Sequence, residues 1–173
     1  MILTILFSLL IQGFTEDFQT LKQGDKISKD FAVKYLNAHP DHYEEYFVYE
    51  TYMKPKFVSC DLSTLIYTEN SGTCRKEILV IFDQNGKILS KLVISSNCDH
   101  DMSIPTYKSW EFQLNLYSSE VVLDISSESV KDKSKIDGNG HIIGDKDFMD
   151  LETIKTNLLE VYKISKDGKI IKQ

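Results

Sequence analysis

The clearest alternation of apolar and polar residues runs through positions 110–126, in two arms separated by a short polar stretch. The apolar positions of the two arms are Trp110, Phe112, Leu114, Leu116, Val121, Leu123 and Ile125. A two-residue turn at Ser118-Ser119 places Leu114 opposite Leu123, and all the apolar side chains then fall on one side. The pattern therefore predicts an antiparallel hairpin with one buried face.

Two further hairpins are predicted from turn dipeptides. Residues 78–82 are continuously apolar, which is typical of a central strand buried on both faces. Asn85-Gly86 follows at once and favours a tight turn into a returning strand over 87–95, because both residues tolerate positive φ. Asp167-Gly168 indicates a similar turn close to the C-terminus.

Helical periodicity is clearest over residues 28–37, where Ser28 is a suitable N-cap and Phe31, Tyr35 and Leu36 share one face. Residues 150–156 also fit a helix, which we expect to pass into a strand before Asp167-Gly168. The polar, glycine-containing stretch 127–147 predicts a long, mobile loop.

Together these elements predict an α+β fold that is mostly antiparallel β. An N-terminal helix would precede a β-meander of about eight or nine strands, forming a curved sheet or a barrel-like one. The chain has 173 residues and an ordinary composition, with 42% apolar and 27% charged residues, so one globular domain is expected.

The N-terminus has the character of a targeting segment. Residues 2–14 are almost entirely apolar and uncharged, a length typical of a signal-peptide core and short for a bilayer span. With Gly13 or Thr15 before the cleavage point, residues 1–15 are the predicted signal peptide and residues 16–173 the domain. No Lys or Arg precedes the apolar run, so a buried N-terminal strand or helix is the alternative. No later apolar run is long enough to cross a membrane.

The chain has three cysteines, Cys60, Cys74 and Cys98, and an odd number in an exported protein predicts one disulfide and one remaining thiol. The hairpin at Asn85-Gly86 would place Cys74 opposite Asn97, one position from Cys98. A bulge or a frayed end would join Cys74 to Cys98, which is the predicted pair. Pairing of Cys60 with either partner, or three reduced thiols, are the alternatives.

Charge and motifs narrow the functional classes. The net charge of −6 and the lack of a long basic run argue against nucleic acid as a partner. No GxSxG, GxGxxG or GxxxxGK[ST] motif occurs, so nothing points to a nucleophilic serine or a phosphate loop. We therefore predict a protein that is not an enzyme and has no cofactor.

One local cluster has the chemistry of metal ligands. Asp99, His100 and Asp101 directly follow Cys98, and a transition metal accepts imidazole and carboxylate ligands. Adjacent residues seldom all reach one ion, and no CxxC or HExxH motif supplies a second pair of ligands. His39 and His42 are three residues apart, but Pro40 between them argues against the helix that would let them share a metal. A loop at the end of a strand is the plainer interpretation, and metal-assisted hydrolysis is our third functional hypothesis.

Aromatic side chains support the first functional hypothesis, a binding module for a small ligand. Tyr46, Tyr49 and Trp110 are the residues that we expect to provide stacking surface for an apolar or sugar-like ligand. The second hypothesis is a protein-interaction or inhibitor-type factor of the cell envelope, using the polar stretch 127–147. Either role would be performed in the periplasm or outside the cell after removal of the leader.

Overall fold

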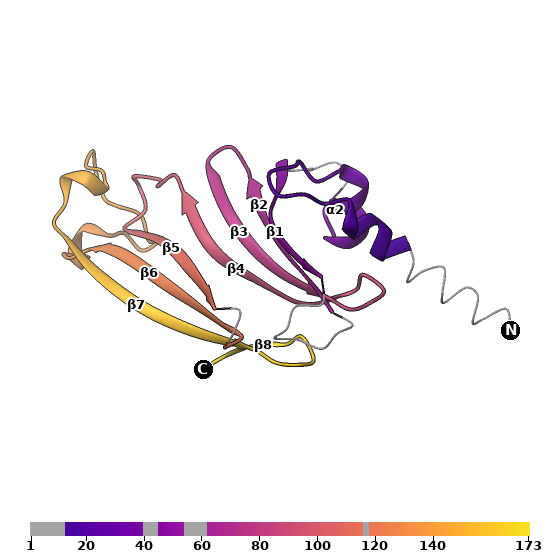
Figure 1. The fold of residues 1–173 in the computed structure, drawn as a ribbon. Helices are drawn as coiled ribbons and strands as arrows, with labels where there is room; N and C mark the ends of the chain where they lie inside the picture. Colours follow the sequence, from indigo (N-terminus) through magenta and orange to yellow (C-terminus); the bar gives the residue numbers. More distant parts are fainter. Residues whose placement is uncertain (1–12, 40–44, 54–61, 116–117) are drawn as a thin grey trace, which may run out of the picture.

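The structure is a computed structural model that describes residues 13–39, 45–53, 62–115 and 118–173. Its centre is one antiparallel sheet whose eight strands follow one another in chain order (Figure 1). The strands are β1 (Glu45–Met53), β2 (Ser63–Asn70), β3 (Cys74–Phe82), β4 (Ile88–Cys98), β5 (Thr106–Asn115), β6 (Glu120–Val130), β7 (Thr153–Ile164) and β8 (Ile170–Lys172). Because β1 and β8 stand at opposite ends of this order, the sheet is an open meander rather than a closed one. The predicted α+β, mostly antiparallel class is confirmed.

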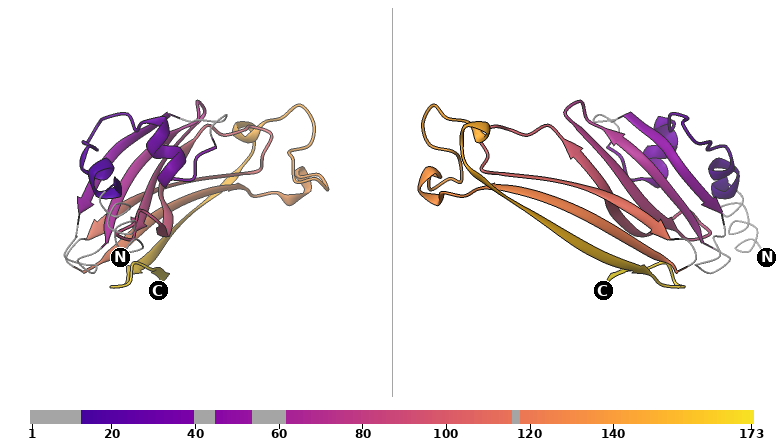
Figure 2. Two further views of the ribbon diagram at one scale, coloured as in Figure 1. Left: turned by 90° about the vertical axis from the view of Figure 1, so that its right-hand side faces the viewer. Right: turned by 60° about the vertical axis from the view of Figure 1, so that its left-hand side comes forward.

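Two short helical segments cover one face of the sheet at its β1–β3 end (Figures 1 and 2). Residues 13–19 are helical, and α2 (Lys29–Tyr35) begins after Ser28, whose Oγ accepts a hydrogen bond from the Phe31 N–H at 3.2 Å. Asn37 has φ 58°, the left-handed conformation that commonly follows a helix end. The core beneath the helices contains Phe14, Phe18, Ile27, Phe31, Ala32, Tyr35, Leu36, Tyr46, Val48, Leu65, Tyr67, Ile78, Val80 and Phe82.

The opposite face of β2, β3 and β4 packs against side chains from the C-terminal strands of the same sheet. Strand β6 contributes Val121 and Leu123, and β7 contributes Ile164, to a second core that also contains Leu79 and Ile81 of β3. The start of β8 lies against β4, where the Ile170 N–H donates to the Ser90 Oγ at 3.3 Å. Residues 78–82 are therefore buried on both faces, as predicted, with relative exposures of 0–2%.

The predicted loop over 127–147 is present from residue 131 onward, whereas its first four residues extend β6. Strand β6 continues to Val130, and two single-turn 3₁₀ helices follow, η1 (Lys133–Lys135) and η2 (Phe148–Asp150). Val130, Ile142 and Phe148 form a third small core. The segment between β6 and β7 lies at the end of the sheet away from α2 (Figure 2). Residues 131–152 connect β6 to β7 with only these two helical turns, so the prediction of a long connection is largely confirmed. The small core was not predicted, because its apolar side chains are far apart in sequence and only meet in the folded chain.

The hairpin of β5 and β6 forms with a different register. Leu114 lies opposite Val121 rather than Leu123, and the ladder ends at Asn115 and Glu120, so four residues connect the strands instead of two. Ser119 has φ 59° in this connection. A shift of two residues keeps every side chain on its predicted face, because side chains alternate along a strand.

The β3–β4 hairpin explains the disulfide. The Asp83 N–H donates to the Lys87 carbonyl, and three residues form the turn between them. Phe82 then pairs with Ile88, and a register shift between Phe82 and Ile81 pairs Ile81 with Ser90. A second register shift, between Glu77 and Ile78, brings Cys74 directly opposite Cys98. The two residues form a disulfide, as predicted from the sequence. Cys60 lies outside the described residues.

The helix predicted over 150–156 is wrong. Only η2 is helical there, and β7 begins at Thr153 and pairs with β6 without interruption as far as Lys163. Leu151, Ile154 and Leu158 have helical spacing, but Ile154 and Leu158 remain 47% and 56% exposed in the strand. Eleven paired positions along β6 outweigh a weak local preference for helix.

Candidate functional site

A polar groove lies where the sheet is least continuous, between β4 and β5. Ser96 and Trp110 form the only pair recorded between these two strands in the described chain, whereas every other neighbouring pair of strands has a longer ladder. The groove encloses about 380 Å³. Its lining residues are Arg75, Glu77, Ser95, Ser96, Asn97, Tyr107, Ser109, Trp110 and Glu111.

Trp110 provides the aromatic surface of the groove. Its indole N–H donates to the backbone carbonyl of Val93 at 3.3 Å, so the ring is tied to β4 beside the gap. Part of the ring packs against the second core, and the rest lines the groove. An indole held in this way offers a rigid apolar surface next to hydrogen-bonding groups.

Glu77 is the most buried charged residue of the groove, at 7% relative exposure. One carboxylate oxygen accepts a hydrogen bond from the Arg75 Nε at 3.1 Å, and the Arg75 side chain remains 61% exposed. Both residues stand on the same face of β3, because they are two positions apart in a strand. A largely buried carboxylate with an exposed guanidinium beside it presents both an acceptor and donors to a bound molecule.

Neighbouring hollows extend this groove in both directions. One shares Arg75 and Asn97 with the groove and reaches the β2–β3 turn at Gly72. Another shares Trp110 and Glu111 and reaches Asn157 on β7. Polar side chains thus form a band across three adjoining hollows, with Trp110 at its centre.

The three predicted ligand-binding aromatics are not brought together. Tyr46 is 7% exposed and packs edge-on against Tyr67, with 5.3 Å between ring centroids, so it belongs to the core. Tyr49 is 38% exposed and contacts Phe112, with ring centroids 5.9 Å apart. Of the three, Trp110 alone lines the groove between β4 and β5.

Two of the three predicted metal ligands, His100 and Asp101, make other contacts, and Asp99 lines the hollow beside Gly72. The His100 Nε2 is 3.0 Å from the Ile104 carbonyl, and its ring packs against Phe148 at 4.3 Å between centroids. Asp101 accepts from the Ser103 N–H at 2.9 Å and from its hydroxyl at 2.8 Å, and these bonds hold the pKa of Asp101 below its ordinary value. Within the described ranges, no group of three or more His, Cys, Asp or Glu side chains is placed to hold a metal ion.

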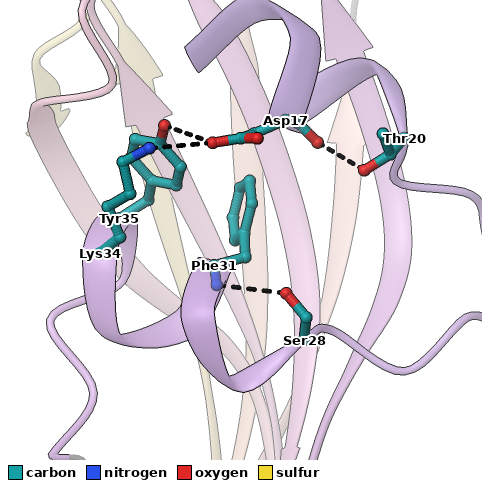
Figure 3. A network of polar contacts seen from close by, with 6 residues as sticks. All are labelled: Asp17, Thr20, Ser28, Phe31, Lys34 and Tyr35. Carbon is teal, nitrogen blue, oxygen red and sulfur yellow. Dashed lines mark hydrogen bonds and ion pairs between the residues drawn. The ribbon is translucent and has the colours of Figure 1, made fainter. Parts of the chain in front are cut away.

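A separate hollow, of about 450 Å³, is lined by residues of the two N-terminal helical segments and of the chain between them. Two of its polar lining residues, Asp17 and Lys34, contact each other: the Asp17 carboxylate accepts from the Lys34 Nζ at 3.0 Å, and it also accepts from the Tyr35 hydroxyl at 2.7 Å (Figure 3). These hydrogen bonds, that of Tyr35 first, lower the pKa of Asp17. Burial, the larger effect, raises the pKa of Tyr35. This network joins residues 13–19 to α2, so we assign it a structural role.

No family model, curated protein or solved structure matches this chain. Among the residues that the structure describes, no helix has the length and apolar character needed to cross a membrane. The functional argument therefore rests on the geometry of the groove.

Sequence reasoning found Trp110 but missed Arg75, Glu77 and Asn97. One signal was present, since Glu77 directly precedes the apolar run 78–82 and stands two residues after Arg75. Charged residues at this spacing share one face of a strand, and the run that follows indicates that the strand is central. These residues are accessible because of the gap between β4 and β5, and no sequence pattern predicts that gap.

Proposed function

We propose that the groove between β4 and β5 binds a small hydroxyl-rich ligand, of the saccharide or polyol class, without chemical conversion. The observation that supports this proposal is that the Glu77 carboxylate, although almost buried, lines the same groove as Trp110. Sugars combine apolar ring faces with hydroxyl groups, so a groove lined by an indole and a carboxylate matches both parts of such a molecule.

The remaining groups of the groove fit the same ligand class. Ser95, Asn97 and Ser109 line it with neutral donors and acceptors, and Arg75 adds exposed donors. Hydroxyl groups both donate and accept hydrogen bonds, so they can satisfy such a mixed set. The disulfide is typical of exported proteins, and we propose that binding takes place outside the cytosol, in the periplasm or beyond the cell.

The test is calorimetric titration of the whole protein with a panel of mono- and oligosaccharides and polyols. Glu77→Gln keeps the side-chain shape and should weaken binding about tenfold or more, because hydrogen bonds to charged groups are worth about 1.5–3 kcal/mol. Trp110→Phe should also weaken binding, since it removes part of the stacking surface and the bond to Val93. Thermal melting of each variant separates loss of binding from loss of folding.

Glu152→Gln is the matched control. It removes the same charge at a site where the side chain is 73% exposed and paired with Lys131, outside the groove. The control should bind as the unchanged protein does. If no member of the panel binds, or if Glu77→Gln and Glu152→Gln bind equally well, the groove is not a saccharide site.

A protein-interaction role is the second candidate function, and a separate feature favours it. Strand β7 carries exposed apolar side chains along an edge of the sheet, including Leu158 and Leu159 at 56% and 65% exposure. This edge lies at the opposite end of the molecule from α2 (Figure 1, yellow strand).

A further inference from the structure

Strand β7 is the longest strand, with 12 residues, and most of one edge carries no neighbouring strand in the described chain. On one side it pairs with β6 from Thr153 to Lys163 without a register shift. On the other side, β8 pairs only with Tyr162, Lys163 and Ile164. Residues 154–159 are all exposed, so none of the described residues covers this part of β7.

The backbone groups that face the open edge can be identified from neighbouring hydrogen bonds. The Gln173 N–H donates to the Val161 carbonyl at 2.9 Å, beyond the end of the β8 ladder, whereas the Ile164 N–H donates to the Ser119 carbonyl on the β6 side at 2.8 Å. Successive residues of a strand direct their backbone groups to opposite edges. Thr153, Lys155, Asn157 and Leu159 therefore present their N–H and C=O groups at the open edge.

This edge has few of the features that normally prevent strands from pairing between molecules. Such features are short edge strands, bulges, prolines and charged side chains, especially lysines. Residues 153–159 contain no Pro or Gly, and their ladder with β6 has no bulge. Their one lysine, Lys155, points its ammonium toward Glu128 at 3.4 Å. The exposed apolar side chains Ile154, Leu158 and Leu159 lie along the same stretch.

The sequence of the edge complements itself in one antiparallel register. With a two-fold axis at Thr156, Ile154 lies opposite Leu158 of a second copy, and Lys155 lies opposite Asn157. Apolar pairs and threonine pairs across strands are stabilising, and no like charges meet. An isologous contact of this kind closes on itself and forms a dimer.

The neighbouring registers are poorer. An axis at Lys155 places two lysines directly opposite each other, which is destabilising. An axis at Asn157 places Ile154 opposite Glu160 and Lys155 opposite Leu159. It also requires backbone pairing at Val161, whose carbonyl already accepts from Gln173. The axis at Thr156 is the one of these three that pairs Ile154 with Leu158, avoids facing lysines and leaves Val161 out of the pairing, with Thr153 opposite Leu159 at the two ends.

We propose that two copies of this chain associate by antiparallel pairing of β7 with β7 about a two-fold axis at Thr156, which joins their sheets into one. Asn157→Pro should abolish the dimer, because it removes an N–H from the open edge and spares the ladder with β6. Leu158→Lys should do so too, by replacing an apolar contact with a charge. Met149→Lys is the matched control, since Met149 is an apolar residue 75% exposed outside the strand.

The measurement is sedimentation equilibrium of the whole protein over an about thousandfold concentration range, with circular dichroism to show that each variant is folded. We expect a dimer that dissociates on dilution for the unchanged chain and for Met149→Lys, and a monomer for both edge variants. A second experiment tests the register in a Cys60→Ser background. Thr156→Cys should form an intermolecular disulfide on mild oxidation, whereas Asn157→Cys should not.

Three results would overturn the proposal. One is a monomer at every concentration, which would leave the edge to a different protein partner. Another is a dimer that both edge variants retain. The third is cross-linking through Asn157→Cys in preference to Thr156→Cys, which would place the axis elsewhere.

Discussion

Replacing Phe14 with alanine should destabilise the protein severely, because this ring joins the N-terminal helical segment to the sheet. Phe14 is 2% exposed, and its ring centroid lies 5.0 Å from Tyr35, 5.4 Å from Phe82 and 5.5 Å from Phe18. Truncating a buried phenylalanine to alanine typically costs about 3–5 kcal/mol, from lost burial and the cavity that remains. Single domains are stable by only about 5–15 kcal/mol, so this one change removes a large share.

The assay is urea unfolding followed by far-ultraviolet circular dichroism. Phe14→Ala should lower the midpoint while leaving the dependence on denaturant unchanged, as expected when stability alone is altered. Met149→Ala is the control, because an apolar side chain that is 75% exposed contributes little to the core. A loss below about 1 kcal/mol for Phe14→Ala would refute the reasoning, since it would mean that the aromatic cluster does not hold residues 13–19 against the sheet.

The same contact bears on the predicted leader. Cleavage after Gly13 would retain Phe14, whereas cleavage after Thr15 would remove it. Chains beginning at residue 14 and at residue 16 should therefore differ in stability by about as much as Phe14→Ala costs. Equal stability of the two chains would contradict this role of Phe14, and the intact mass of the protein made in cells would show whether either boundary is used.

Three further predictions address the disulfide, an acid-sensitive contact and a tight turn. Replacing Cys74 and Cys98 together by serine should cost about 3–4 kcal/mol in urea unfolding, because the bond closes a loop with a sequence separation of 24; an unchanged midpoint would exclude this contribution. The pKa of Asp17 is lower in the folded state than in the unfolded state, so the ionised carboxylate stabilises the fold above the unfolded pKa of about 4. This stabilisation is lost as the pH falls through the folded-state pKa. The melting temperature of Asp17→Asn should accordingly be lower than that of the unchanged chain near neutral pH and approach it in acid; a constant difference would refute the linkage. Gly86→Ala should destabilise by more than about 1 kcal/mol, because Gly86 has φ 81° and a Cβ there would lie 2.8 Å from the Tyr35 ring; a melting temperature equal to that of the unchanged chain would contradict this.

Local patterns accounted for much of the fold. Strict alternation identified which faces of β5 and β6 are buried, and the continuous apolar run identified β3 as a central strand. Turn residues located the connections at Gly86 and Gly168, which both have positive φ. Such features were predictable because they depend on backbone chemistry and on the two-residue period of a strand.

The candidate site was much less predictable. Trp110 was identified as a binding residue from its type, but Tyr46 has the same aromatic character and lies in the core. What separates them is the gap between β4 and β5, which exists because only Ser96 and Trp110 pair across it. The number of paired residues between two strands depends on both strands together, so the sequence of either strand alone does not predict this gap.

The sequence by itself determined which faces of the strands are buried, the helix cap at Ser28 and the glycine turns, because each of these depends on residues only a few positions apart. The tertiary structure alone decided that residues 153–156 are a strand, that β5 and β6 pair two residues out of the expected register, and that Glu77 opens into a groove. These outcomes depend on contacts between distant segments, whose combined burial and hydrogen bonding outweigh local preferences of less than about 1 kcal/mol per residue.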